Sequence, residues 1–342
     1  MRAVLLTGFG GLDKLDYRED VPDPEPGPGE VRVRVGAAAL NNTDIWTRQG
    51  AYGSADDPDA SAGWRREPLT FPRIQGADVA GRIDQVGPGV ADDRIGERVL
   101  IDPMLYDGGE RALVTTDYLG SERDGGFAEF VTVPSANAHA VDVSLSDAEL
   151  ATFPTAYATA MRMLNRADVG LGETVLVTGA SGGVGSALIQ LASIRGARVI
   201  AVAGKGKESR ARDLGAVDVI GRDELATVSD DVVDVVADVV AGPSFPGLLR
   251  ALRPLGRYVV AGAIAGPLVE TDLRTVYLKQ LRLIGSSFGS HDDFAELLTH
   301  ISSGELIPLL AGSYPLRELR AAQEAFVAKD FFGKLVVVPG ES

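Results

Sequence analysis

The segment "NNTD", Asn41–Asp44, places two amides, a hydroxyl and a carboxylate side by side, and Trp46 and Tyr52 follow closely. Amides and hydroxyls can donate hydrogen bonds to a reacting carbonyl, whereas a short run of this kind can equally begin a helix, with Asn41 as its cap. Asp44 is expected to fix the local turn by accepting backbone N–H groups. The chemistry of this segment depends on a second segment near residue 180.

That second segment is a strand, a glycine turn, a helix and another strand within about 30 residues, which is the pattern of a dinucleotide-binding unit. It reads "TVLVTGASGGVGSALIQLASIRGARVIAVAG" from Thr174. Glycines in the turn let the backbone approach a pyrophosphate, and the helix N-terminus offers unpaired N–H groups to the anion. The predicted contacts are Ser181, Gly182, Gly183, Val184 and Gly185.

The residues after the second strand favour NADPH over NADH. A site for NADH usually carries an acidic residue there, but this chain has Ala203 and Gly204, followed by the cations Lys205, Lys207 and Arg210. Such a cluster suits a 2′-phosphate. The alternative, charges on a solvated helix face, stays open.

The rest of the chain predicts an α/β fold of two domains. Apolar segments such as "VDVVADVVAG", "GRYVVAGA" and "LRLIGSSFG" extend a doubly wound parallel sheet, whose strand ends near Ser287 should approach the nicotinamide. Short alternating strands and many Pro and Gly turns predict a mainly β domain before residue 150. We expect one domain from residues 1–150 and 289–342, interrupted by the dinucleotide-binding domain at 151–288.

Composition excludes several functions. Acidic residues outnumber basic ones by 48 to 33, giving a net charge of −15, which disfavours nucleic acid and anionic membranes as partners. The chain has no cysteine and only three histidines, so thiol nucleophiles, disulfides and thiolate metal ligands are absent. No apolar run is long enough to span a membrane, and the expected location is cytoplasmic.

The motifs taken together resemble the medium-chain dehydrogenase/reductase superfamily, which includes zinc alcohol dehydrogenases and zinc-free NADPH quinone reductases. They are "NNTDIWTRQGAY", "IQGADVAGRIDQVGPGV", "GERVL", "DGGFAEFVTVP", "FPTAYATA", "TGASGGVGSA" and "GKLVVVP". They occur in the family's order and cover nearly the whole chain. The resemblance implies a Rossmann sheet inserted in a GroES-like, mainly β domain.

The same resemblance implies that zinc is not used. The zinc members would carry Cys, His and Cys at the positions of Asn41, Ala77 and Ala151, and residues 102–124 correspond to a lobe that holds a structural zinc in some relatives. None of these positions offers a good zinc ligand here, and Asp78 alone is not a tetrahedral site.

By this resemblance, Asn41, Trp46 and Tyr52 line the substrate pocket, and Thr43 or water supplies the proton. Trp64 lies on a long segment, residues 53–72, that could cover the substrate. The remaining cofactor contacts are Thr155 at the nicotinamide ring, Lys334 at the pyrophosphate, and Ala261, Ser287 and Phe288 at the strand ends.

Without a Lewis acid, the acceptor must itself be electron-poor. The sequence therefore predicts an NADPH-dependent, metal-independent reductase of quinones or α,β-unsaturated carbonyls, with Asn41 and Tyr52 polarising the carbonyl. Two alternatives stay open: a specialised reductase of secondary metabolism, and a non-catalytic NADPH-binding redox sensor. The family also implies a homodimer paired through the strand in "LRLIGSSFG".

Overall fold

The computed structural model describes residues 1–52, 69–225 and 228–340. The contacts divide the chain into two compact units. Unit 1 comprises Met1–Thr155 and Pro308–Ser342, and unit 2 comprises Ala156–Ile307. The second unit is thus inserted in the first, as the sequence predicts.

Unit 1 is built mainly from antiparallel strands. Its main sheet has the order β10-β6-β5-β3-β18-β17, with β9 also paired to β3, and a smaller sheet has the order β2-β1-β4. Alternation in "EVRVRV" produces alternating burial along β3. The strands are β1 (Ala3–Leu6), β2 (Leu15–Arg18), β3 (Glu30–Ala39), β4 (Arg73–Ile74), β5 (Asp78–Val86), β6 (Arg98–Ile101), β7 (Met104–Leu105), β8 (Asp117–Tyr118), β9 (Phe130–Pro134), β10 (Ala138–Ala140), β17 (Leu310–Pro315) and β18 (Lys334–Val338).

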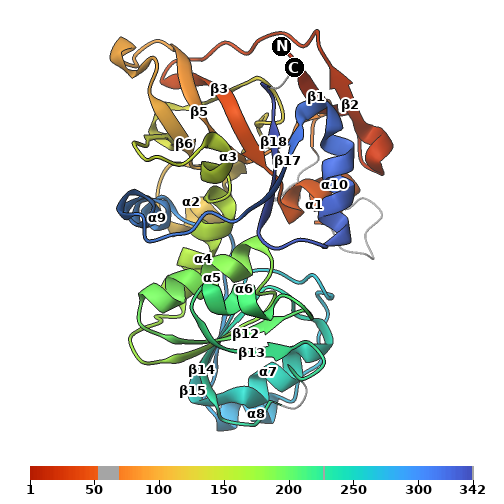
Figure 1. The fold of residues 1–342 in the computed structure, drawn as a ribbon, viewed down its shortest axis with the longest axis vertical. Coiled ribbons are helices and arrows are strands. Elements are labelled where there is room, and N and C mark those ends of the chain that lie inside the picture. Colours follow the sequence, from red (N-terminus) through yellow and green to blue (C-terminus); the bar gives the residue numbers. More distant parts are fainter. Residues whose placement is uncertain (53–68, 226–227, 341–342) are drawn as a thin grey trace. The chain divides into compact units, whose positions relative to one another are not determined.

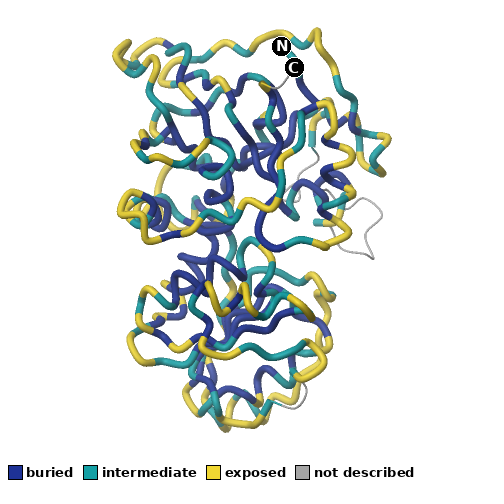
Figure 2. The backbone as a smooth tube through the Cα atoms, in the orientation of Figure 1, coloured by how far each residue is buried: buried dark blue, intermediate teal, exposed yellow. Residues whose placement is uncertain are grey.

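Short helices connect these strands, and α10 packs against β17 and β18 (Figure 1). They are α1 (Asn42–Gln49), α2 (Glu110–Val114), α3 (Asp147–Leu150) and α10 (Leu319–Ala328), with the 3₁₀ turns Leu12–Lys14, Asp92–Arg94, Ser135–Asn137 and Leu316–Glu318. Helix α3 begins with a capping box, because Ser146 Oγ accepts the Glu149 N–H and the Glu149 carboxylate accepts the Ser146 N–H. The buried face of the main sheet forms a continuous core, dark in Figure 2.

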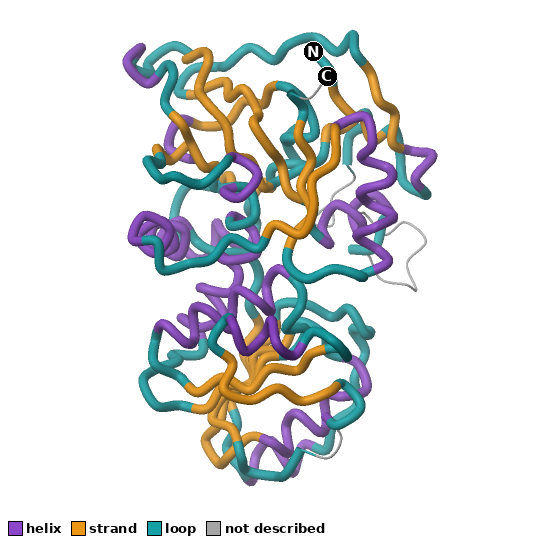
Figure 3. The backbone as a smooth tube through the Cα atoms, in the orientation of Figure 1, coloured by secondary structure: helices purple, strands orange, loops and turns teal. Residues whose placement is uncertain are grey.

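Unit 2 contains one parallel sheet with the order β13-β12-β11-β14-β15-β16. Helices α5 and α6 lie on one face and α7 and α8 on the other, so the sheet is doubly wound, as Figures 1 and 3 show. The strands are β11 (Thr174–Val177), β12 (Arg198–Ala203), β13 (Ala216–Gly221), β14 (Val233–Asp238), β15 (Leu252–Val260) and β16 (Arg282–Gly285). The helices are α4 (Pro154–Arg166), whose first two residues belong to unit 1, α5 (Gly183–Ile194), α6 (Glu208–Asp213), α7 (Phe245–Ala251), α8 (Leu273–Leu278) and α9 (His291–Ser303), with a 3₁₀ turn at Gly242–Ser244.

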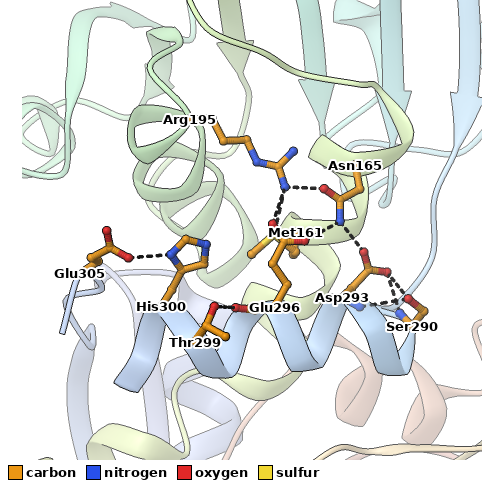
Figure 4. A network of polar contacts seen from close by, with 9 residues as sticks. All are labelled: Met161, Asn165, Arg195, Ser290, Asp293, Glu296, Thr299, His300 and Glu305. Carbon is orange, nitrogen blue, oxygen red and sulfur yellow. Dashed lines mark hydrogen bonds and ion pairs between the residues drawn. The ribbon is translucent and has the colours of Figure 1, made fainter. Parts of the chain in front are cut away.

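Helix α9 groups with unit 2, whereas the sequence assigned residues from 289 onward to the first domain. Polar contacts explain this grouping. The buried Asp293 carboxylate accepts hydrogen bonds from Arg162, at 3.2 Å, and from Asn165, at 2.7 Å, both on α4. Arg195, which follows α5, contacts Asn165 and Glu296, so that three elements are joined (Figure 4). Across the described residues, no helix is both long and apolar enough to cross a membrane.

Candidate functional site

In unit 1, a buried cluster forms where β3, β5 and β18 lie side by side. Asn41 follows β3 directly, Asp78 begins β5, and Lys334 begins β18. Register places Ala39 opposite Asp78, and Leu40 N–H bonds to Leu335 O at 2.9 Å. Three segments that are distant in sequence thus bring an amide, a carboxylate and an ammonium group together.

The Lys334 ammonium is the centre of this cluster. It donates to Asn41 Oδ1 at 2.5 Å and to Asp78 Oδ2 at 2.9 Å, and the Lys334 residue is only 3% exposed. Asp78 Oδ1 accepts the backbone N–H of Thr155 at 2.9 Å, so both oxygens of this carboxylate are bound. Thr155 lies in the first turn of α4, where the helix dipole also favours an anion.

The structure shows what the Lys334 side chain contacts within unit 1. By resemblance this side chain is predicted to reach the cofactor pyrophosphate, which stays a prediction, and its ammonium is buried against Asn41 and Asp78. The physical reason is that Lys334 begins β18, and the pairing of β18 with β3 turns its side chain toward the start of β5.

Asn41 and Asp44 hold the start of α1. The Asp44 carboxylate accepts the Asn41 N–H at 2.7 Å, which confirms the predicted turn-fixing role of Asp44. Burial raises the pKa of Asp44 to about 7, and the Asp78 carboxylate adds to this shift. Helix α1 is further held by Arg48, which donates to Gln323 on α10 and to Gly10 O.

Asn41 also carries a donor without a partner. Its amide nitrogen Nδ2 is buried and makes no hydrogen bond to any described residue. The side-chain orientation is determined, because Lys334 can only donate and must therefore face the amide oxygen. A buried unpaired donor costs roughly 1 to 3 kcal/mol, so this N–H group would gain from an acceptor atom.

Three hydroxyls form a chain beside this cluster. Tyr118 Oη lies 2.9 Å from Thr155 Oγ1 and 3.5 Å from Thr43 Oγ1. Burial, followed by the charge of Asp78, raises the pKa of Tyr118 well above its ordinary value, so the phenol stays protonated. Sequence reasoning missed Tyr118, since it lies in the segment interpreted as a metal-lobe remnant.

Two glycine motifs hold the backbone that leads into Asp78. The N–H groups of Gly125, Gly126 and Phe127 donate to carbonyls of Ile74, Gly76 and Gln75. A Cβ at Gly125 would lie 2.3 Å from Gly76 O, which is too close for any other residue. The motifs "IQGAD" and "DGGFAEF" therefore act together to support the site.

The aromatic residues of the predicted pocket form an edge-to-face pair. The rings of Trp46 and Tyr52 have centroids 5.8 Å apart at an interplanar angle of 74°. Burial raises the pKa of Tyr52, with smaller contributions from Asp44 and Glu122, so its phenol is a donor at neutral pH. Trp64 lies outside the described residues.

In unit 2, the helix that follows the first strand begins at Gly183, and the cap residue Gly182 provides no side-chain hydrogen bond. Among the described residues, a Cβ added at Gly182 would meet just Gly179 O, at 3.5 Å, which is an ordinary contact. Gly182 therefore leaves open the space in front of the helix N-terminus. Gly185 serves packing instead, because its Cβ would lie 2.2 Å from Gly179 O. This geometry fits a bound pyrophosphate.

Basic residues lie at the end of β12. Lys205 and Lys207 follow Gly204, and Arg210 lies on α6. A further cation, missed by sequence reasoning, is Arg222 after β13: a Cβ at Gly204 would lie 3.6 Å from its guanidinium carbon. The parallel pairing of β12 with β13 explains the approach of Arg222, because it brings the C-terminal ends of both strands to one edge.

A buried carboxylate accepts several hydrogen bonds at the C-terminal ends of the central strands. Asp238, at the end of β14, accepts hydrogen bonds from Thr178, Tyr258 and the N–H groups of Val240 and Ala241. Its own carbonyl accepts the Ala261 N–H at 3.1 Å. The predicted residues Ala261, Ser287 and Phe288 follow β15 and β16, which are neighbours in the sheet.

Two family models match the chain. Residues 27–143 match the alcohol dehydrogenase GroES-like domain, and residues 183–303 match the zinc-binding dehydrogenase domain. The chain belongs to the medium-chain dehydrogenase/reductase superfamily. An acryloyl-coenzyme A reductase of Metallosphaera sedula is 32% identical over 98% of this chain and 99% of its own length. A quinone oxidoreductase of Mus musculus is 31% identical over 96% of this chain and 94% of its own length.

Solved structures agree on the fold. A Sinorhizobium meliloti protein, provisionally assigned as an alcohol dehydrogenase, superposes with a TM-score of 0.94 at 56% identity, covering 99% of this chain and 96% of that one. The 2-octenoyl-CoA carboxylase reductase CinF was solved with NADP and 2-octenoyl-CoA. It superposes with a TM-score of 0.85 at 25% identity, covering 100% of this chain and 88% of that one.

Zinc, which one family description names, does not fit the residues in this cluster. Ala77 and Ala151 offer only methyl groups, while the oxygens of Asn41 and Asp78 are bound by Lys334 and Thr155. Within the described part of the chain, no three His, Cys, Asp or Glu side chains gather as a metal would require.

Proposed function

We propose that this protein is an NADPH-dependent, metal-independent reductase that delivers hydride to a quinone or an α,β-unsaturated carbonyl compound. The observation that carries this proposal is the buried, unpartnered Nδ2 of Asn41, in a cluster whose cation is an ammonium rather than a metal. The similarity to quinone oxidoreductases and acryloyl-coenzyme A reductases supports the same substrate class.

NADPH would be held by unit 2, with its pyrophosphate at the N-terminus of α5 and its 2′-phosphate near Lys205, Lys207, Arg210 and Arg222. When bound, it supplies the hydride. Hydride addition would place negative charge on the acceptor oxygen, which hydrogen-bond donors can stabilise. Asn41 Nδ2 and the protonated Tyr52 phenol are the donors, and in a site that excludes water such donors are strong.

A proton from water must also reach the reduced acceptor, and the chain of hydroxyls can pass it on. Thr43, Tyr118 and Thr155 can each accept one proton while donating another, so the raised pKa of Tyr118 does not prevent transfer. Electron-poor acceptors need no Lewis acid, since conjugation spreads the developing charge.

The first experiment is a steady-state screen with NADPH of quinones, enones and enoyl-coenzyme A thioesters, each with and without a chelator, beside a screen of simple alcohols with NADP⁺. We expect turnover on the conjugated acceptors, no effect of the chelator, and no stoichiometric metal by elemental analysis. Alcohol oxidation that needs stoichiometric zinc would contradict the proposal. Tight NADPH binding without any turnover would support the non-catalytic sensor.

The second experiment tests the assigned donor. Asn41→Ala should lower kcat on a good acceptor by about 100-fold to 1,000-fold, the usual loss for one oxyanion donor, with unchanged NADPH affinity. Asn42→Ala is the matched control: its amide is adjacent but half-exposed and bonded to Lys329. Equal kcat values in both variants would remove the assignment.

The third experiment tests the cofactor preference. We expect NADPH to bind at least tenfold better than NADH, equivalent to about 1.4 kcal/mol. Replacing Lys205 and Lys207 by Ala should remove most of this preference and leave NADH affinity nearly unchanged, as isothermal titration can show. Equal affinities in the unmodified protein would make the cofactor assignment wrong.

A further inference from the structure

The Lys334–Asp78 pair is a fully buried ion pair next to the unpartnered donor of Asn41. Lys334 is 3% exposed and Asp78 is 0% exposed. Removing two charges from water is costly, and buried pairs often contribute no net stability compared with apolar residues of similar size. Stability is therefore a weak explanation for this pair, and its contact with Asn41 suggests another role.

We propose that Lys334 is a positioning residue for the reductase reaction, acting through Asn41. The proposal rests on the proposed function. The ammonium holds the Asn41 carboxamide in one orientation, with Oδ1 inward at 2.5 Å and Nδ2 left for the acceptor oxygen. Besides the capping contact of the Asn41 side chain with the N3 backbone of α1, Lys334 is the group that holds Oδ1 inward, so a neutral apolar residue there would leave the amide less firmly oriented.

The charge of Lys334 also strengthens the donor. A cation bound to the oxygen of an amide pulls electron density from its nitrogen, which makes the N–H groups better hydrogen-bond donors. Lys334 thereby transmits positive charge to the substrate oxygen without touching it. Asp78 has a supporting part: it fixes the ammonium at 2.9 Å and is itself fixed by the Thr155 N–H.

The test compares Lys334→Met, the charge-free double variant Lys334→Met with Asp78→Asn, and Lys334→Arg. The double variant avoids an uncompensated buried carboxylate, so it keeps the test valid where the single variant fails to fold. Lys329→Met is the matched control, because it removes a neighbouring cation whose Nζ lies 3.1 Å from Asn42 Oδ1.

We expect the double variant to bind NADPH with unchanged Kd and to lose about 100-fold in kcat, comparable to the loss of an oxyanion donor. Lys329→Met should retain its kcat, and Lys334→Arg should recover part of the loss, since it restores the charge. In an Asn41→Ala background, removing Lys334 and Asp78 charges should cause little further loss, because the effect passes through Asn41.

Several outcomes would overturn the proposal. An unchanged kcat in the folded double variant would do so, as would a full additional loss in the Asn41→Ala background. A weaker NADPH Kd with normal kcat would assign Lys334 to the cofactor instead. These results are distinct from failure of the proposed function, in which the unmodified protein would already show no turnover on conjugated acceptors.

Discussion

Asp44 shows how burial near the site makes a single residue sensitive to pH. Its pKa is raised to about 7 by burial, whereas an exposed Asp in the unfolded chain titrates near 4. Between these values, the folded protein keeps a proton that the unfolded chain has released. The free energy of unfolding therefore falls as pH rises through this window, and the contribution is fully present below it.

Asp44→Asn removes this titration, and its Oδ1 can still accept the Asn41 N–H. We expect the difference in melting temperature, variant minus unmodified protein, to become more positive between pH 5.5 and pH 8.0. Each tenfold change in proton affinity is worth about 1.4 kcal/mol. Differential scanning calorimetry across this range measures the effect. A difference in melting temperature that stays the same at all pH values would contradict the prediction.

At the level of elements, two glycines at the start of α5 are expected to have different roles, one in ligand binding and one in packing. Gly182 and Gly185 are three residues apart, yet only Gly185 is in close contact with the preceding turn. Gly182→Ala should keep the melting temperature, because its φ of −86° is accessible to any residue, and should weaken NADPH binding by filling the anion site. Gly185→Ala should lower stability by about 1 to 3 kcal/mol, as overpacking does.

Thermal melting and NADPH titration of the two variants check this prediction. If Gly182→Ala bound NADPH as tightly as the unmodified protein, the pyrophosphate would not lie at this helix. A stable Gly185→Ala variant would show that the turn can move away from α5.

The contrast between local and distant features explains what the sequence could predict. The strand, turn and helix from Thr174 to Ile194 were predictable because periodicity and glycine placement act over neighbouring residues. The Lys334–Asp78 pair spans 256 positions and depends on the pairing of β3 with both β5 and β18. An Asp and a Lys at the first positions of two strands in one predicted sheet were the available signal, but register decides whether they meet.

Tyr118 and Arg222 were missed for the same reason. Each becomes relevant only through a contact formed in the fold, Tyr118 with Thr155 and Arg222 at Gly204. The fold class, in contrast, followed from motifs that each describe one short segment, and the family comparisons confirm it.

At the level of the whole molecule, the surface around β16 predicts a homodimer. β16 is an edge strand of the parallel sheet, and Leu283 on it is 47% exposed. Large apolar side chains are also exposed on α8 and in the segment before it: Ile264, Leu268, Leu273, Tyr277 and Leu278. An exposed strand edge surrounded by apolar side chains is a common site for self-association. A twofold axis would cover the β16 edges of both subunits at once.

Light scattering should return about twice the chain mass of 35.9 kDa at micromolar concentration. Leu283→Lys should shift the protein toward the monomer, because a charge on the paired edge loses its hydration on association. The matched control is Val217→Lys on β13, the opposite edge of the same sheet, where the replaced side chain is 54% exposed. This control should remain dimeric. A monomeric unmodified protein would remove the prediction, and dissociation by Val217→Lys alone would assign the interface to the other edge.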